Sequence, residues 1–281
     1  MSKQFRGREG DVTAVDTKTA LTTMGSDTAP GALFVPQGKT HITAVIVSAI
    51  QNMAAATGYS AFVRLEGPGM VNGPETIAVG AGGNNVATGG NAVKEAKRIP
   101  VNFPVTEANE IQIFGEMCGT DIGGMGVIVG LEFSDAAGDG ATEHRTITLE
   151  GDVTAVDTRT SLDTQGSLTA PSKLVPAGYS KIDKIIVAGA SDGLANGKAS
   201  LFLRLGGNAV LGGEQVIPVS TVGRIAVQAG SDSAPQFAQP IVLDNLDIAV
   251  SPSDTISVWA EQAGDDTGTC YVVATLVFAK G

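Results

Sequence analysis

The stretch Gly10-Asp11-Val12-Thr13-Ala14-Val15-Asp16-Thr17 occurs a second time, without a change, as Gly151-Asp152-Val153-Thr154-Ala155-Val156-Asp157-Thr158. Further segments return in the same order: Val35-Pro36 and Gly38 as Val175-Pro176 and Gly178, Ile42–Val47 as Ile182–Val187, Ser60–Leu65 as Ser200–Leu205, Glu110–Phe114 as Thr255–Trp259, and Leu131–Phe133 as Leu276–Phe278. Self-similarity of this kind is the signature of a duplicated structural unit. The sequence therefore predicts two copies of one unit in tandem.

The segment between the two copies has the composition of a linker. Residues 134–141 read Ser-Asp-Ala-Ala-Gly-Asp-Gly-Ala, which is small, polar and rich in glycine. We expect an N-terminal arm over residues 1–10, a first repeat over 11–137, a linker over 138–146 and a second repeat over 147–281.

Short apolar segments with a period of two fill each copy, separated by Gly, Pro, Asn and Asp. In the first copy they lie near residues 12–17, 41–48, 60–66, 75–79, 99–105, 110–116 and 126–133, with a further short one at 33–35. Only Asn91–Arg98 is typical of a short helical turn. Seven or eight strands in about 140 residues are typical of a sandwich. The predicted fold class is all-β, with two tandem, duplicated, antiparallel β-sandwich (jelly-roll-like) domains.

Composition and charge exclude several classes of protein. The 281 residues include 29 acidic and 18 basic side chains, and the net charge of −11 disfavours a surface built to bind nucleic acid. A hydrophobic fraction of 43% argues against disorder. No apolar run reaches the 18 residues or so of a membrane-spanning helix. The N-terminus shows no apolar signal segment, so we expect the chain to be made and folded in a cytoplasm.

With tandem β units over nearly its whole length, the chain resembles the double jelly-roll major capsid proteins of icosahedral viruses. The resemblance is one of architecture, without a diagnostic motif, and the plain repetition departs from that family. It implies a structural protein, the major capsid subunit, that self-assembles through homotrimeric, pseudo-hexameric capsomers into a shell, with or without other capsid proteins. The location implied is the virion, after assembly in the host cytoplasm.

Two alternatives to a capsid subunit stay open. One is a carbohydrate-binding tandem β-sandwich module, although a single Trp and three Tyr are few for stacking on sugars. The other is a subunit of an extracellular filament or surface layer. Fold alone does not decide among them.

Basic residues supply the candidate contact sites. Lys3, Arg6 and Arg8 make the N-terminal segment locally basic, and the resemblance suggests an arm that faces the particle interior and contacts the genome, an internal membrane or a neighbouring subunit. The alternative is a solvated, disordered terminus. Arg64 and Arg204 occupy matching strand positions, so we expect them at an interface or on a sheet surface.

Acidic turns are the one place where the residues leave a cofactor open, namely Ca²⁺, which takes six to eight oxygen ligands. The candidate acids are Glu9, Asp11 and Asp16, their repeats Glu150, Asp152 and Asp157, and the turn acids Asp121, Asp265 and Asp266. The alternative is that these acids cap turns and protect an edge strand. Otherwise we expect no cofactor.

No pattern of nucleophile and base emerges from the chain. The two histidines, His41 and His144, are expected at solvated or strand-edge positions, and Cys118 and Cys270 as small core or near-surface residues. Trp259 is expected in the core. We therefore expect no catalytic or metal-ligating residue, and no enzyme.

Overall fold

The computed structural model describes residues 3–51, 58–83, 95–119, 124–138, 142–191, 198–223, 236–264 and 268–281. Every regular element in these ranges is a β-strand, and adjacent strands pair antiparallel. The predicted all-β fold class is confirmed. No helix in the described chain is long and apolar enough to cross a membrane.

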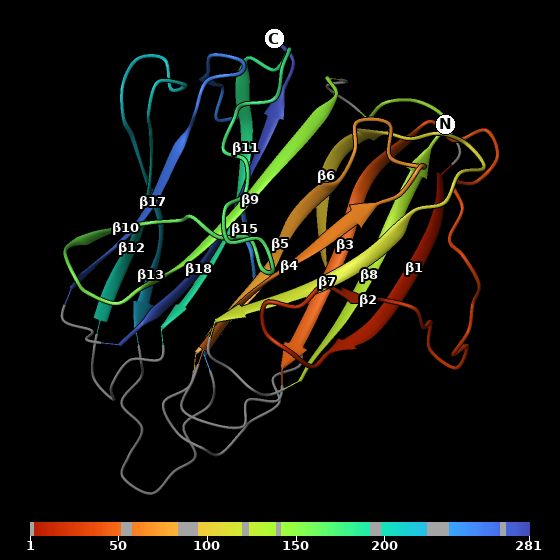
Figure 1. The fold of residues 1–281 in the computed structure, drawn as a ribbon, viewed down its shortest axis with the longest axis horizontal. Coiled ribbons are helices and arrows are strands. Elements are labelled where there is room, and N and C mark those ends of the chain that lie inside the picture. The colour runs from red at the N-terminus through yellow and green to blue at the C-terminus, as the bar shows by residue number, and fades with distance from the viewer. Residues whose placement is uncertain are drawn as a thin grey trace, which may run out of the picture.

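The first unit is a sandwich of two sheets (Figure 1). Sheet I has the order β1 (Lys3–Val12), β8 (Met125–Ser134), β3 (His41–Gln51) and β6 (Lys97–Pro104). Sheet II has the order β14 (Gln236–Ala238), β5 (Glu75–Gly83), β4 (Gly58–Glu66), β7 (Gln112–Gly119) and β2 (Thr19–Ala20). Its edge strand β14 comes from the second half of the chain, so the two halves share a sheet.

The second unit repeats this plan. Sheet III has the order β15 (Ile241–Leu243), β11 (Lys181–Ser191), β18 (Cys270–Ala279) and β9 (His144–Val153), with β16 (Ile248–Ala249) also paired to β11. Sheet IV has the order β10 (Thr158–Ser161), β17 (Ser257–Gly264), β12 (Lys198–Gly206) and β13 (Gln215–Gly223). Sheet III therefore corresponds to sheet I, and sheet IV to sheet II.

The duplication extends to the register of the strands. Val12 lies opposite Met125 in sheet I, and its repeat Val153 lies opposite Cys270 in sheet III. The register shifts between Ile42 and Ala44 in β3, and between Ile182 and Lys184 in the equivalent strand β11. Such irregularities re-aim side chains, and their recurrence makes the two units structurally equivalent position by position.

The four sheets form successive layers, in the order I, II, III, IV (Figure 1). Apolar side chains fill the space within each sandwich, as alternation along buried strands requires. The first core does not stop at the boundary of its unit, because it also includes Ile186, Ala188, Ala190, Val273 and Val277 of sheet III. The two units therefore bury one another's apolar surface.

The expected N-terminal arm is wrong, because these residues are regular structure. Lys3–Val12 pairs with β8 over ten successive positions, so the backbone groups of the segment are satisfied by a sheet rather than by water. The expected linker over 138–146 is also too long at its C-terminal end, since β9 begins at His144.

The repeated motif itself is a strand end followed by a turn, not a strand over 12–17. The β1 strand ends at Val12, and Asp16 and Asp157 adopt φ angles of 51° and 52°. Asp is among the few residues that enter this left-handed region readily. The expected helical turn at Asn91–Arg98 lies partly outside the described residues, and its last two residues begin strand β6.

Candidate functional site

A buried ion pair lies on the outer face of sheet II, where the second unit covers it. Arg64 on β4 donates from Nε to Oε1 of Glu116 on β7 over 2.8 Å. The two residues are 7% and 0% exposed. A buried charge needs both a partner and further hydrogen bonds, and the second unit supplies them.

The covering element is a turn of the second unit, Gln165–Leu168. The backbone N–H of Ser167 donates to Oε2 of Glu116 over 3.1 Å, and its hydroxyl to the same oxygen over 3.2 Å. Gly166 fits because it has no side chain: a Cβ there would lie 2.2 Å from the Glu116 carboxylate and 3.0 Å from the Phe62 ring. The turn is thus docked on the ion pair at van der Waals contact.

Glu150 ties the same turn to both units. It accepts the backbone N–H of Gly166 over 3.1 Å within its own unit. It also accepts the hydroxyl of Ser60 on β4 over 2.8 Å, across the boundary. Burial raises the pKa of Glu150, and hydrogen bonds from Cys118 and these partners oppose that shift.

Strand β5, which β14 pairs only at residues 81–83, makes a second polar contact across the boundary. The backbone N–H groups of Thr76 and Ala78 donate to the hydroxyls of Thr146 and Thr275 in sheet III, each over 2.8 Å. Glu75 accepts from the backbone N–H and the hydroxyl of Thr146, over 2.7 and 2.8 Å. Burial raises the pKa of Glu75 to about 8, against the opposing effect of Arg145. Threonines of one unit therefore complete the sheet edge of the other.

The second unit carries the same ion pair on its own outer face. Arg204 of β12 donates to Glu261 of β17, which occupy the positions of Arg64 and Glu116 in the register. No described residue of another unit covers this pair, and the two side chains are 20% and 18% exposed. Arg204 also donates to Glu214 over 3.0 Å, and Glu214 accepts from Arg159 over 2.8 Å.

The first unit contains the equivalent turn, but among the described residues this turn contacts no ion pair. Met24–Asp27 corresponds to Gln165–Leu168, and Oε1 of Glu9 accepts the backbone N–H of Gly25 over 2.7 Å, as Glu150 does for Gly166. Met24 is 48% exposed, and a Cβ on Gly25 would meet no atom within 4 Å. One copy of the turn is docked and the other is free.

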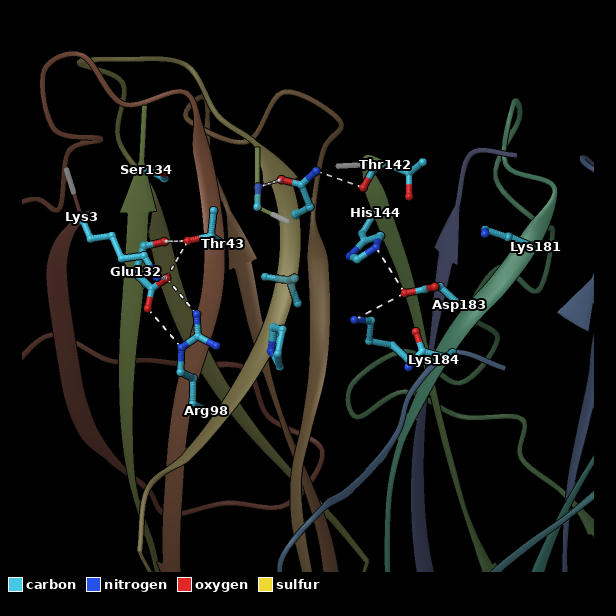
Figure 2. A pocket seen from close by; sticks show the side chains of 15 residues that line it. Lys3, Thr43, Arg98, Glu132, Ser134, Thr142, His144, Lys181, Asp183 and Lys184 are labelled. Carbon is cyan, nitrogen blue, oxygen red and sulfur yellow. Dashed lines mark hydrogen bonds and ion pairs between the residues drawn. The ribbon is translucent and has the colours of Figure 1, made fainter. Parts of the chain in front are cut away.

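A polar pocket of about 440 Å³ lies at the seam between the units (Figure 2). On its first-unit wall, Glu132 accepts from Arg98 over 2.9 Å and from Thr43 over 2.8 Å, and pairs with Lys3 over 2.8 Å. The hydrogen bond from Arg98, together with those from Lys3 and Thr43, lowers the pKa of Glu132 to about 2.

On the opposite wall of the pocket, Asp183 lies 3.6 Å from Nε2 of His144 and 3.4 Å from Nζ of Lys184 (Figure 2). Burial lowers the pKa of His144 to about 4, and the nearby Lys184 adds to this effect. The imidazole is therefore neutral at pH 7. Among the described residues, the acidic group of each wall is paired with cations of its own wall, so the pocket presents no unpaired carboxylate. A hydrogen bond from the side-chain amide of Asn102 to the Thr142 carbonyl, over 3.0 Å, joins the two walls.

The structure places the three basic residues of the N-terminal segment on strand β1. Lys3 pairs with Glu132, and Arg8 donates to the carbonyls of Gly7 and Gly31, each over 2.8 Å. Arg6 is exposed. Arg8 is thus part of the folded unit rather than of a free arm.

The candidate Ca²⁺ acids do not gather as the repeat suggested. Within the described residues, Asp16 of one unit and Glu150 of the other lie near Cys118, with ligand atoms within 4.8 Å of one another. Burial raises the pKa of the Cys118 thiol well above its usual value, and the adjacent carboxylates add to this effect. Two carboxylates and a protonated thiol fall short of the oxygen set that Ca²⁺ prefers. Asp121, Asp265 and Asp266 lie outside the described residues.

The two histidines, the two cysteines and the tryptophan differ in placement. His41 is partly exposed, with Nδ1 2.8 Å from the Thr40 hydroxyl, whereas His144 lies on the edge strand β9 but is buried. Cys118 and Cys270 are buried. Trp259 lies on the outer face of sheet IV, half-buried, so the expected core position is wrong: the alternation of β17 points Val258 and Ala260 inward and Trp259 outward.

The residues that sequence reasoning missed are the acids that face the arginines. Glu116 and Glu261 lie two positions beyond the recognised repeat of Glu110–Phe114 and Thr255–Trp259. Extending that alignment by two residues finds them. The repeated Gly-Ser of the two turns, at 25–26 and 166–167, was a second available signal.

No protein-family model matches the chain, and no curated protein matches it. Solved structures that are similar include a peptide-N(4)-(N-acetyl-β-D-glucosaminyl) asparagine amidase, at 9% identity and a TM-score of 0.39 over 99% of this chain and 96% of that one. The major capsid protein P2 of bacteriophage PM2 is similar at 9% identity and a TM-score of 0.31, over 100% and 99%. A chain in the structure of broad bean stain virus is similar at 9% identity and a TM-score of 0.34, over 86% of this chain and 77% of that one.

These similarities concern the fold alone. A viral major capsid protein and a virus particle are among the similar structures, with TM-scores of 0.31 and 0.34. The expectation that the chain is not an enzyme is contradicted, because an amidase is similar over nearly the whole chain. We withdraw that expectation, and the low TM-scores give no basis for assigning the amidase's reaction here.

Proposed function

We propose that this chain is a structural subunit that self-assembles into a closed viral shell, through trimers in which six units form a pseudo-hexameric tile. The observation that carries the proposal is the contact between the two units, in which the outer face of sheet II packs on the outer face of sheet III. The proposed location is the virion, after assembly in the host cytoplasm.

The contact joins two different faces of equivalent units. Sheet II of one unit meets sheet III of the next, and sheet III corresponds to sheet I, so the contact is head-to-tail. After two units join head to tail, both kinds of face are still available. The first unit keeps the outer face of sheet I, which is equivalent to sheet III, and the second keeps the outer face of sheet IV, which is equivalent to sheet II. Repetition of such a contact closes a ring or continues as a filament. Rings of six units, made of three chains, are the closed form that we propose.

A carbohydrate-binding module is a second candidate, favoured by the outer face of sheet IV. Trp259 lies there beside the charged cluster of Arg204, Glu261, Glu214 and Arg159. An aromatic ring flanked by polar groups is a surface on which a sugar can stack and form hydrogen bonds. This candidate predicts a monomer that retains glycans.

Size-exclusion chromatography with light scattering, followed by negative-stain imaging of the same fractions, separates the two candidates. Trimers, hexagonal tiles or closed shells support the shell subunit. A monomer at every concentration, salt and pH tested overturns it, and a glycan array on that monomer then tests the module.

A further inference from the structure

We infer that the outer face of sheet IV binds the outer face of sheet I of a second chain, with the turn Met24–Asp27 of that chain docked on the Arg204–Glu261 pair. The inference rests on the proposed self-assembly and names its contact. The partner is a second copy of this chain, and the contact repeats between chains what the molecule already forms between its units.

The free turn has the backbone of the docked one. In Met24–Asp27 the two end residues exchange N–H···O bonds of 2.9 and 3.0 Å, and in Gln165–Leu168 both bonds are 2.9 Å. Gly25 and Gly166 have φ angles of 59° and 53°. Ser26 therefore presents its N–H and hydroxyl in the geometry with which Ser167 reaches Glu116.

The exposed ion pair offers the matching acceptor. Glu116 accepts Arg64 on one carboxylate oxygen and Ser167 on the other. Glu261 accepts Arg204 on Oε2, and within the described part of the chain its Oε1 has no partner. One carboxylate oxygen is thus left for the serine of an incoming turn.

Apolar side chains flank both free faces at the positions that the internal contact buries. Inside the chain, Phe62 of sheet II is fully buried in one cluster with Ile186 and Val273 of sheet III. The counterpart of Phe62 on sheet IV is the half-buried Phe202, which pairs in register as Phe62 does.

On the opposite end of the molecule, sheet I exposes Ile128 at the position of Val273, and Phe5 at that of Thr146. Their exposed fractions are 56% and 57%, and Val216 on sheet IV, at the position of Thr76, is 49% exposed. These apolar side chains are exposed at positions whose counterparts are buried in the internal contact. The outer faces of sheets IV and I are thus equivalent to the two faces that form the contact within the chain, and they lie at opposite ends of the stack of sheets.

One difference makes the contact between chains weaker than the contact within the chain. Glu132, held by Arg98 and Lys3, occupies on sheet I the position of the apolar Val277 on sheet III. Charged side chains hold water at the contact that Val277 excludes. A weaker repeat of the same contact is what reversible assembly requires, because misplaced subunits must be able to dissociate.

The test uses two variants of the full chain and one control. Ser26→Glu places a carboxylate against Glu261, and Glu261→Lys removes the acceptor and sets a cation beside Arg204. Thr13→Glu is the control, since Thr13 and its repeat Thr154 are both exposed and thus lie outside the internal contact. We expect each of the first two variants to lower the association constant at least tenfold in sedimentation equilibrium, and the control to leave it unchanged.

Mixing provides the specific readout. An equimolar mixture of the Ser26→Glu and Glu261→Lys chains forms heterodimers, because the carboxylate added to the turn of one chain can pair with the ammonium group added to sheet IV of the other. Association of both single variants at the wild-type constant, or absence of heterodimers in the mixture, overturns this contact while leaving self-assembly intact. A wild-type chain that stays monomeric overturns the proposed function as well. Circular dichroism of each variant verifies that it is folded.

Discussion

Replacing Glu116 by Ala should destabilise the fold far more than replacing its structural twin Glu261 by Ala. Glu116 is 0% exposed and holds Arg64, which is itself 7% exposed. Its removal leaves the guanidinium buried, with Glu66 at 3.5 Å as its one remaining charged partner among the described residues. Breaking a buried pair by removing one partner costs about 3–5 kcal/mol. The donors of Ser167 also lose their acceptor.

Glu261→Ala removes the equivalent carboxylate at a site that is more exposed to water. Arg204 keeps Glu214 at 3.0 Å after Glu261→Ala, and both members of the pair are partly exposed. Ion pairs in contact with water contribute about 0–1 kcal/mol. We therefore expect a difference of about 3 kcal/mol in the free energy of unfolding between the two variants.

The assay is urea denaturation at a protein concentration below self-association, followed by tryptophan fluorescence and circular dichroism. Coincident transitions by the two probes justify a two-state analysis, and an unchanged m-value shows that the unfolded state is comparable. Equal losses for Glu116→Ala and Glu261→Ala would refute the reasoning, because the expected difference between them comes from the burial of Arg64 and Glu116 under the second unit. The pair Arg64→Met with Glu116→Leu, which leaves no buried charge, should recover most of the loss.

Three further predictions concern single elements. Deleting residues 1–10 should unfold the first unit rather than trim a free arm, because it removes most of a strand paired with β8 over ten positions; loss of the cooperative transition in a thermal melt checks this. Gly166→Ala should cost at least about 1 kcal/mol more than Gly25→Ala, since both have positive φ but only the first meets Glu116 and Phe62; the measurement is urea denaturation of both. The contribution of His144 to stability should fall by about 3 kcal/mol between pH 6.5 and 4, because the unfolded imidazole takes a proton at about 6.5 and the buried one only at about 4. Glu75, whose pKa is raised by burial to about 8, acts in the opposite direction over this range, so the measurement is the difference between the pH profiles of the wild type and His144→Asn; identical profiles would contradict the prediction.

The repeat and the period-two alternation were enough to predict the architecture. Segments such as Ser60–Leu65 and Ser200–Leu205 carry the same alternation, and they form the equivalent strands β4 and β12. The equivalence of the units in register, down to the position of the bulges, follows from that repetition. What decides these features is local, because each strand's alternation records which of its faces is buried.

The N-terminal strand could not be predicted from the repeat and the alternation of apolar residues. Lys3, Arg6 and Arg8 give residues 3–8 a polar character that is typical of a disordered terminus, and Phe5 is exposed. The strand forms because β8 offers it a free edge, and the backbone bonds do not depend on side-chain polarity. A charged edge strand and a solvated terminus have the same composition, so only the partner distinguishes them.

The different burial of Arg64 and Arg204 could not be predicted from the sequence. The two arginines share their strand position, a phenylalanine two residues before, a leucine directly after and a glutamate partner. One is nevertheless covered by the turn Gln165–Leu168, whereas the other is partly open to water. The difference arises from the packing of the units: the second unit covers sheet II of the first, and no described residue of another unit covers sheet IV. Among the described residues, the turn Met24–Asp27 likewise has no ion pair to dock on. The contact that we propose between chains would cover both faces with a second copy of the chain, and it differs from the internal contact at Glu132, which stands in place of Val277.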